Sequence, residues 1–137
     1  MRFVMFMYPN MEVVGDWGPP SAEDVAAMGR FNEELTKAGV LLSLDGLHPA
    51  SEGARVRFGG GKTTVTDGPF AEAKEVVSGY WLIQAKSKEE AVEWASRCPA
   101  GDGDMIEVRR VYEMSDFPDD VQAAAKLSQE PPEQTRA

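Results

Sequence analysis

The chain has 137 residues, and 42% of them are hydrophobic, which suits a single folded domain with a core of its own. It has 23 acidic and 14 basic residues, so its formal net charge is −9. A nucleic-acid surface needs clustered Lys and Arg, and anionic membranes repel acidic chains. We therefore expect no nucleic-acid partner and no membrane partner.

The apolar stretch in the N-terminal run MRFVMFMYPN is too short for a membrane span or a signal-peptide core. We interpret Arg2 to Tyr8 as a first strand that stops at Pro9, in a cytoplasmic protein. Trp17, in the loop that follows, is either a lid over a cavity or a plug on the core. A single cysteine, Cys98, fits a reducing compartment and is expected to be a packing residue.

The clearest helix signal begins at Ser21, which has the residue type of an N-cap, with Asp24 in the first turn. Apolar residues then recur at helical spacing until Gly39, a suitable residue just beyond a helix end: Val25, Met28, Phe31 and Leu35. The pattern predicts a helix from Ser21 to Ala38.

The next elements are predicted to be a strand and a hairpin. Val40 to Leu44 is a continuous apolar run that should continue to His48 and stop at Pro49. The segment from Ala54 to Thr66 alternates about a Gly59-Gly60-Gly61 turn, which predicts a β-hairpin. The sequence GGGKTT lacks the glycine spacing and the following helix of a P-loop.

Three further elements complete the predicted domain. Val76 to Ala85 has the strongest strand signal. Ser87 and Glu90 form a capping-box pattern that predicts a second helix, and Met105 to Tyr112 is a last strand.

The resulting order is strand, helix, strand, hairpin, strand, helix, strand. This predicts an α+β fold, the ferredoxin-like arrangement with an inserted β-hairpin, over residues 1–115. Residues 116–137 are predicted to be an acidic, partly disordered tail with a helical turn or two at 123–127. One face of such a sheet is left bare by the helices, so a second copy of the chain is expected to cover it.

The turn Asp67-Gly68-Pro69-Phe70 offers the first candidate site residues. Pro69 can occupy the first helical position, with helix-favouring residues from Phe70 to Lys74. Asp67 either caps the free N–H groups of that helix or, with Phe70, lies at the mouth of the sheet as part of a binding site.

His48 is the single histidine and the natural candidate for proton transfer near neutral pH. It is either a structural residue before a proline or part of an acid/base pair with a carboxylate from the ends of the hairpin segment, Asp67 or Glu75. One His and one Cys with scattered carboxylates show no metal-ligand spacing, so no metal site is expected.

Glu107 and Arg109 alternate on the last strand and should point to the same face of the sheet. On an interior face, they would hold an anionic or polar ligand. On an outward face, they would be a solvated pair of charges.

The run VTDGPFAEAKEVVSGYWLI, with LDGLHP upstream and EVRRVYE downstream, resembles the DGPF subgroup of the YCII-related proteins over residues 1 to 117. The resemblance implies a dimeric α+β barrel, and in the wider family a His and Asp pair in a pocket. The residues that match the subgroup pattern are Asp67, Gly68, Pro69, Phe70, Glu75, Gly79 and Tyr80. The family's histidine lies on the first helix, which has none here, so His48 would take its place.

We therefore expect a homodimer with a pocket between helix and sheet for a small polar or aromatic molecule. As an enzyme, it would need no cofactor and would transfer protons in an isomerase- or lyase-like reaction, with His48 as acid/base, Asp67 orienting it and Arg109 steadying an anion. The alternative is a non-catalytic binding or regulatory module for a protein partner, because the resemblance links some relatives to extracytoplasmic-function sigma factors.

Overall fold

The computed structural model describes residues 1–11, 19–70 and 75–125. The sheet and hairpin strands in this part of the chain are β1 (Arg2–Tyr8), β2 (Leu41–Gly46), β3 (Ala54–Gly59), β4 (Lys62–Asp67), β5 (Gly79–Gln84) and β6 (Met105–Arg110). The helices are α2 (Ala22–Lys37), α3 (Lys88–Ser96) and α4 (Asp119–Ala125), with short 3-10 turns η1 (Ala50–Glu52) and η2 (Met114–Asp116).

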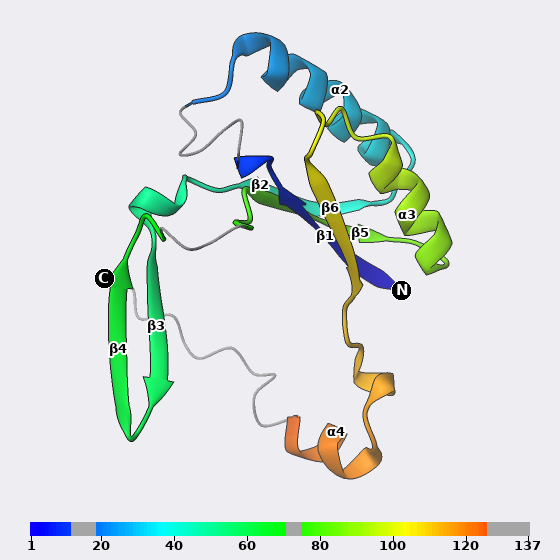
Figure 1. Ribbon diagram of the computed structural model, residues 1–137. Coiled ribbons are helices and arrows are strands. Elements are labelled where there is room, and N and C mark those ends of the chain that lie inside the picture. Colours follow the sequence, from blue (N-terminus) through cyan, green and yellow to red (C-terminus); the bar gives the residue numbers. More distant parts are fainter. Residues whose placement is uncertain (12–18, 71–74, 126–137) are drawn as a thin grey trace, which may run out of the picture.

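Four strands form one antiparallel sheet in the order β2–β5–β1–β6, and β3 and β4 pair separately as a two-stranded sheet. Helices α2 and α3 lie together on one side of the four-stranded sheet (Figure 1). The protein is therefore a mixed α+β protein with antiparallel sheets, and its element order is consistent with a ferredoxin-like fold.

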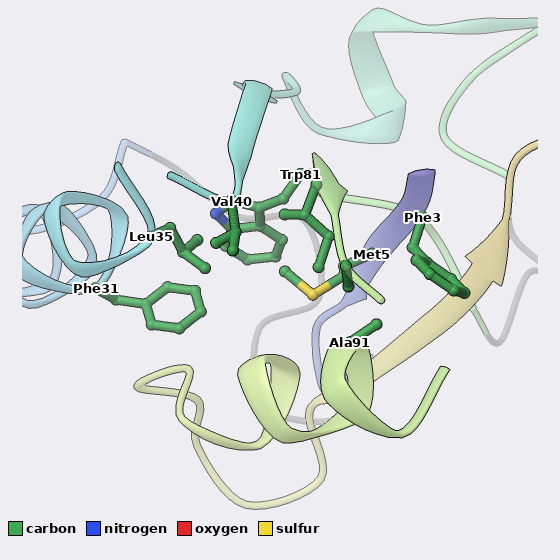
Figure 2. Packing of buried hydrophobic residues seen from close by; sticks show 9 residues of the cluster. Phe3, Met5, Phe31, Leu35, Val40, Trp81 and Ala91 are labelled. Carbon is green, nitrogen blue, oxygen red and sulfur yellow. The ribbon is translucent and has the colours of Figure 1, made fainter. Parts of the chain in front are cut away.

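The core lies between the sheet and the two helices (Figure 2). Alternation along β1 buries Phe3 and Met5 on this side and turns Val4 and Phe6 to the other side. The remaining buried residues come from the neighbouring strands, the helices and their flanks: Phe31, Leu35, Val40, Trp81, Ile83, Ala85 and Ala91. We call the opposite side, with Val4, Phe6, Tyr80, Leu82, Glu107 and Arg109, the open face.

The helix starts are capped as predicted, with one difference. Ser21 Oγ accepts a 3.1 Å hydrogen bond from the Asp24 backbone N–H, and Ser87 Oγ accepts one of the same length from Glu90. The Glu90 carboxylate binds the backbone N–H of Lys86, at 2.9 Å, rather than that of Ser87. The predicted capping box is therefore shifted by one residue at its acidic end.

Strands β2, β5 and β6 are shorter than predicted because each ends where its partner ends. β2 stops at Gly46, opposite Gly79, so His48 lies beyond the strand rather than at its end. β5 likewise starts at Gly79, not at Val76. β6 stops at Arg110, because β1 begins at Arg2.

The hairpin turns through two glycines. Gly59 pairs with Lys62, and the two residues between them, Gly60 and Gly61, have φ angles of 56° and 74°. Two consecutive positive φ angles are the requirement of a type I′ turn, which glycine meets without steric strain. The glycine run thus serves the chain reversal, as expected.

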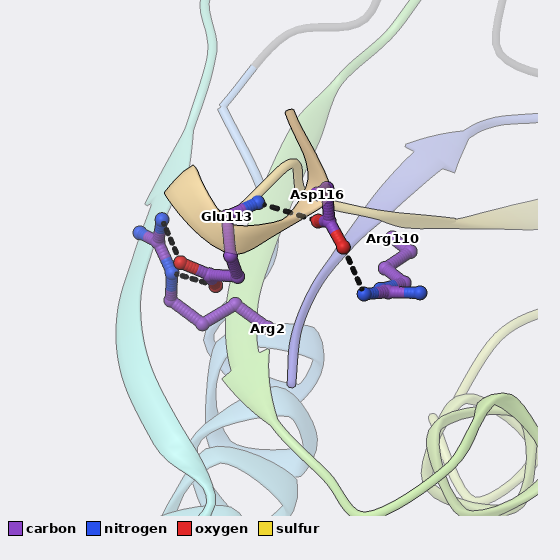
Figure 3. Close-up of polar contacts among 4 residues, drawn as sticks. All are labelled: Arg2, Arg110, Glu113 and Asp116. Carbon is purple, nitrogen blue, oxygen red and sulfur yellow. Dashed lines mark hydrogen bonds and ion pairs between the residues drawn. The ribbon is translucent and has the colours of Figure 1, made fainter. Parts of the chain in front are cut away.

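The chain after β6 is tied back to the first strand by a polar network (Figure 3). Arg2 donates two hydrogen bonds to the Glu113 carboxylate, at 2.7 and 3.2 Å. Asp116 accepts from the Glu113 backbone N–H and from Arg110, both at 2.7 Å. The Arg2 guanidinium lowers the pKa of Glu113, mainly through the hydrogen bond.

A lowered pKa in the folded state makes Glu113 stabilising at neutral pH. This contribution is present above the pKa of an unfolded glutamate, about 4.3, and is lost as the pH falls through the lower folded value. We expect Glu113→Gln to lower the urea midpoint at pH 7 and to have a smaller effect at pH 3. Urea unfolding at the two pH values checks this, and an equal effect at both would contradict it.

Several predictions fall on residues outside the described ranges. Trp17, residues 71–74 of the helix expected after Pro69, and the last ten residues of the tail belong there. Pro69 and Phe70 themselves are in no helix, and the Gly68–Pro69 peptide bond is cis. Within the described residues, no helix is both long and apolar enough to cross a membrane.

Candidate functional site

The structure places His48 at the base of the hairpin, in contact with Glu52. His48 Nδ1 lies 2.7 Å from Glu52 Oε2, and the His48 side chain is 86% exposed. The carboxylate that reaches His48 is therefore Glu52, four residues on and held by the η1 turn, and not the predicted Asp67. A histidine this exposed has water on most sides rather than an enclosed reaction site.

Asp67 ends β4 on the same hairpin base. It pairs with Ala54, and the next residue, Gly68, donates a 2.8 Å hydrogen bond to the carbonyl of Gly53. A Cβ atom on Gly68 would overlap the carbonyl oxygen of Ala50, so only glycine permits this approach. Gly68 thus joins the end of the hairpin to η1.

Phe70 is held at the hairpin base by a cation–π contact. The guanidinium carbon of Arg55 lies 3.9 Å from the centre of the Phe70 ring. Both side chains are half-buried. This contact gives Phe70 a structural role that its place in the sequence did not reveal.

Three predicted site residues share the open face of the sheet: Tyr80, Glu107 and Arg109. Tyr80 and Glu107 both lie opposite Phe6, one on each side, and Asp45 continues the same row beyond Tyr80. Arg109 lies in the next row, opposite Val4. Glu107 and Arg109 do share one face, as predicted, and both are exposed in the single chain.

The Tyr80 hydroxyl donates a 2.7 Å hydrogen bond to Asp45 Oδ2. This bond, the Asp45 charge and partial burial all raise the pKa of Tyr80, so its phenol keeps its proton at neutral pH. Backbone packing positions the pair, because Gly79 approaches so closely that a Cβ there would lie 3.0 Å from the Asp45 carbonyl oxygen.

A cavity of about 160 Å³ lies between α2 and the sheet, and Asp45 and Tyr80 border it from their strands while their side chains share the open face. Asn32 also lines it, and its Oδ1 accepts a 2.8 Å hydrogen bond from Trp81 Nε1. The other walls are mostly apolar or backbone: Met7, Met28, Leu44, Gly46, Ser78, Gly79 and Trp81. A cavity of roughly 150 Å³ holds one benzene-sized ring.

A second, more open cavity of about 540 Å³ lies where β1 ends beside the start of β6. Glu75 is its acidic lining residue, together with Tyr8, Pro9, Asn10, Met11, Gly103 and Met105. His48, the other partner expected for Glu75, is in the lining of neither cavity.

Cys98 and the possible metal ligands of the described residues were the remaining candidates for a site. Burial, with Asp104 nearby, raises the pKa of the Cys98 thiol to about 11, so it is not a thiolate at neutral pH. No three His, Cys, Asp or Glu side chains of residues 1–11, 19–70 and 75–125 gather as a metal site.

The predicted site residues thus divide among the hairpin base, the open face and the larger cavity. Sequence reasoning missed Asn32 as a lining residue, although a signal was present. Asn32 is polar within the apolar helical stripe formed by Met28, Phe31 and Leu35, and such a residue needs a buried partner. The Glu52 contact also had a signal, the i to i+4 spacing from His48.

An antiparallel α+β fold with a pocket between helix and sheet defines the structural class. A family model for the YCII-related domain matches residues 1–115, and the chain belongs to this family. The chain is also 32% identical over 96 residues to the "Uncharacterized protein R00369" of Rhizobium meliloti (strain 1021). That match covers 69% of this chain and 77% of the relative.

Proposed function

We propose that the protein binds a small polar or aromatic molecule in the cavity between α2 and the sheet, where Asn32 is the polar side chain of the helix. The carrying observation is the Asn32–Trp81 hydrogen bond among apolar walls, since ligand pockets combine an apolar lining with a few placed polar groups. Asn32 Oδ1 accepts from Trp81, and the amide group of the same side chain has N–H donors for an oxygen of the ligand. One aromatic ring fits the volume.

The proposal includes a homodimer of the DGPF subgroup, supported by the tetrapeptide Asp67 to Phe70 and by the open face. Apolar side chains on that face are only partly buried in one chain, among them Val4, Phe6 and Leu82. Packing two open faces would enclose Glu107 and Arg109 within a barrel.

An acid/base reaction carried by His48 and Asp67 has weaker support, because His48 is exposed and paired with Glu52. Neither cavity described above is lined by either residue. The binding function therefore stands first.

A fragment screen by ligand-observed NMR tests the binding site. We expect one-ring fragments with an acceptor oxygen to bind the wild type, and Asn32→Ala to weaken them about two- to tenfold, because a neutral hydrogen bond contributes roughly 0.5–1.5 kcal/mol. Asp67→Ala is the control, a truncation to alanine at the hairpin base outside the lining of this cavity, and should leave binding unchanged. Fragments that bind Asn32→Ala as well as the wild type would contradict the site.

A further inference from the structure

The β3–β4 hairpin has an apolar face that is open to solvent in the single chain. Val56 and Val65 lie directly opposite one another, and alternation puts Phe58 on the same face. Their exposed fractions are 52%, 64% and 81%. An exposed group of large apolar residues on one element is typical of an interaction surface.

The other face of the hairpin is basic. Arg55, Arg57 and Lys62 alternate with the apolar residues, and Asp67 is the one acidic residue of residues 54–67. This segment therefore carries a charge of +2, whereas the rest of the chain carries −11. A cationic element on an otherwise anionic chain is complementary to another copy of the same chain.

The hairpin is also placed to reach a second copy. It extends from the four-stranded sheet on the side opposite α2 and α3 (Figure 1). Its base is anchored through Gly68 and the Arg55–Phe70 contact, while its strands pair only with each other among the described strands. An isolated two-stranded hairpin is marginally stable in water, so a surface against its apolar face would stabilise it.

We infer that the hairpin is a clasp that docks on a second copy of this chain. Its apolar face, Val56, Phe58 and Val65, packs against the partner's open face, whose apolar residues are Val4, Phe6 and Leu82. The positive charge of the hairpin offsets the repulsion between two acidic chains. By twofold symmetry, each copy gives one clasp and receives one. The inference rests on the homodimer in the proposed function and adds a second contact to it.

Site-specific photo-crosslinking in the purified full-length protein tests where the clasp docks. A benzophenone amino acid at position 58 should give covalent dimers, with the crosslink on the open face of the second chain. The same group at position 64, on the opposite hairpin face, is the control and should give few. Crosslinks from position 58 only within one chain would overturn the inference.

Sedimentation measurements separate this inference from the dimer itself. Phe58→Ser should raise the dimer Kd at least about tenfold, because it removes a large apolar side chain from the contact. The control Thr64→Ser should not change it. If Leu82→Glu on the open face abolishes the dimer while Phe58→Ser leaves the Kd unchanged, the clasp is overturned and the dimer stands. A wild type that stays monomeric at every soluble concentration overturns both, and the fragment screen still tests the pocket.

Discussion

Replacing Trp81 with alanine is expected to lower the free energy of unfolding by about 3–5 kcal/mol, the usual range for removing a large aromatic side chain from a core. Trp81 is 5% exposed, and its ring meets Phe31 edge-on with centroids 5.8 Å apart. Its Nε1–H also donates a hydrogen bond to Asn32. The substitution therefore removes both a ring contact and a hydrogen bond between β5 and α2. Urea unfolding followed by far-UV circular dichroism measures the loss.

Trp81→Phe is the matched control, because it keeps an aromatic ring and removes the hydrogen bond to Asn32. We expect it to be clearly less destabilising than alanine. Since Trp81 also lines the cavity, the alanine variant should lose the fragments that the wild type binds. An unfolding free energy within about 1 kcal/mol of the wild type would contradict the central place of Trp81 in the core.

Replacing Gly68 with alanine is expected to lower the unfolding free energy by about 1–3 kcal/mol, the usual effect of forcing extra atoms into a filled space. The new Cβ would overlap the Ala50 carbonyl oxygen, so β4 would have to move away from η1. Thermal or urea unfolding gives the overall effect. Amide hydrogen exchange in β3 and β4 should show faster opening there than in the four-stranded sheet.

Gly59→Ala is the control for this effect, because no atom lies within 4 Å of a Cβ at Gly59 and its φ is not positive. It lies on the same hairpin, so both variants change the chain in the same element. Equal destabilisation by the two substitutions would show that general loss of glycine flexibility, and not the Ala50 contact, is responsible.

The regular elements could be predicted because their signals are local. Helical spacing and the Ser21 cap defined α2, and alternation with a glycine turn defined the hairpin strands. The strand ends could not be predicted as well, because a strand stops where its neighbour stops, as β2 does at Gly46 opposite Gly79. Such limits depend on pairing between segments far apart in the chain.

The candidate site was predictable in its residue types more than in its contacts. Tyr80 and Glu107 were singled out from the sequence, and register places them in one row across the sheet. The partner of His48 was not predicted, because Asp67 and Glu52 both lie near the hairpin in sequence and only the η1 turn decides which carboxylate reaches it. The Asp45 contact of Tyr80 likewise depends on strand register.

The place of β1 in the sheet also sets an order of events during synthesis. β1 is made first, yet its partners are β5 and β6, and β6 leaves the ribosome about 100 residues later. At a synthesis rate of roughly 5–20 residues per second, about 5–20 s pass between the synthesis of β1 and that of its last partner strand, β6. The two hairpin strands are neighbours in sequence and can pair with each other before β6 is made, whereas the four-stranded sheet has to wait for β6.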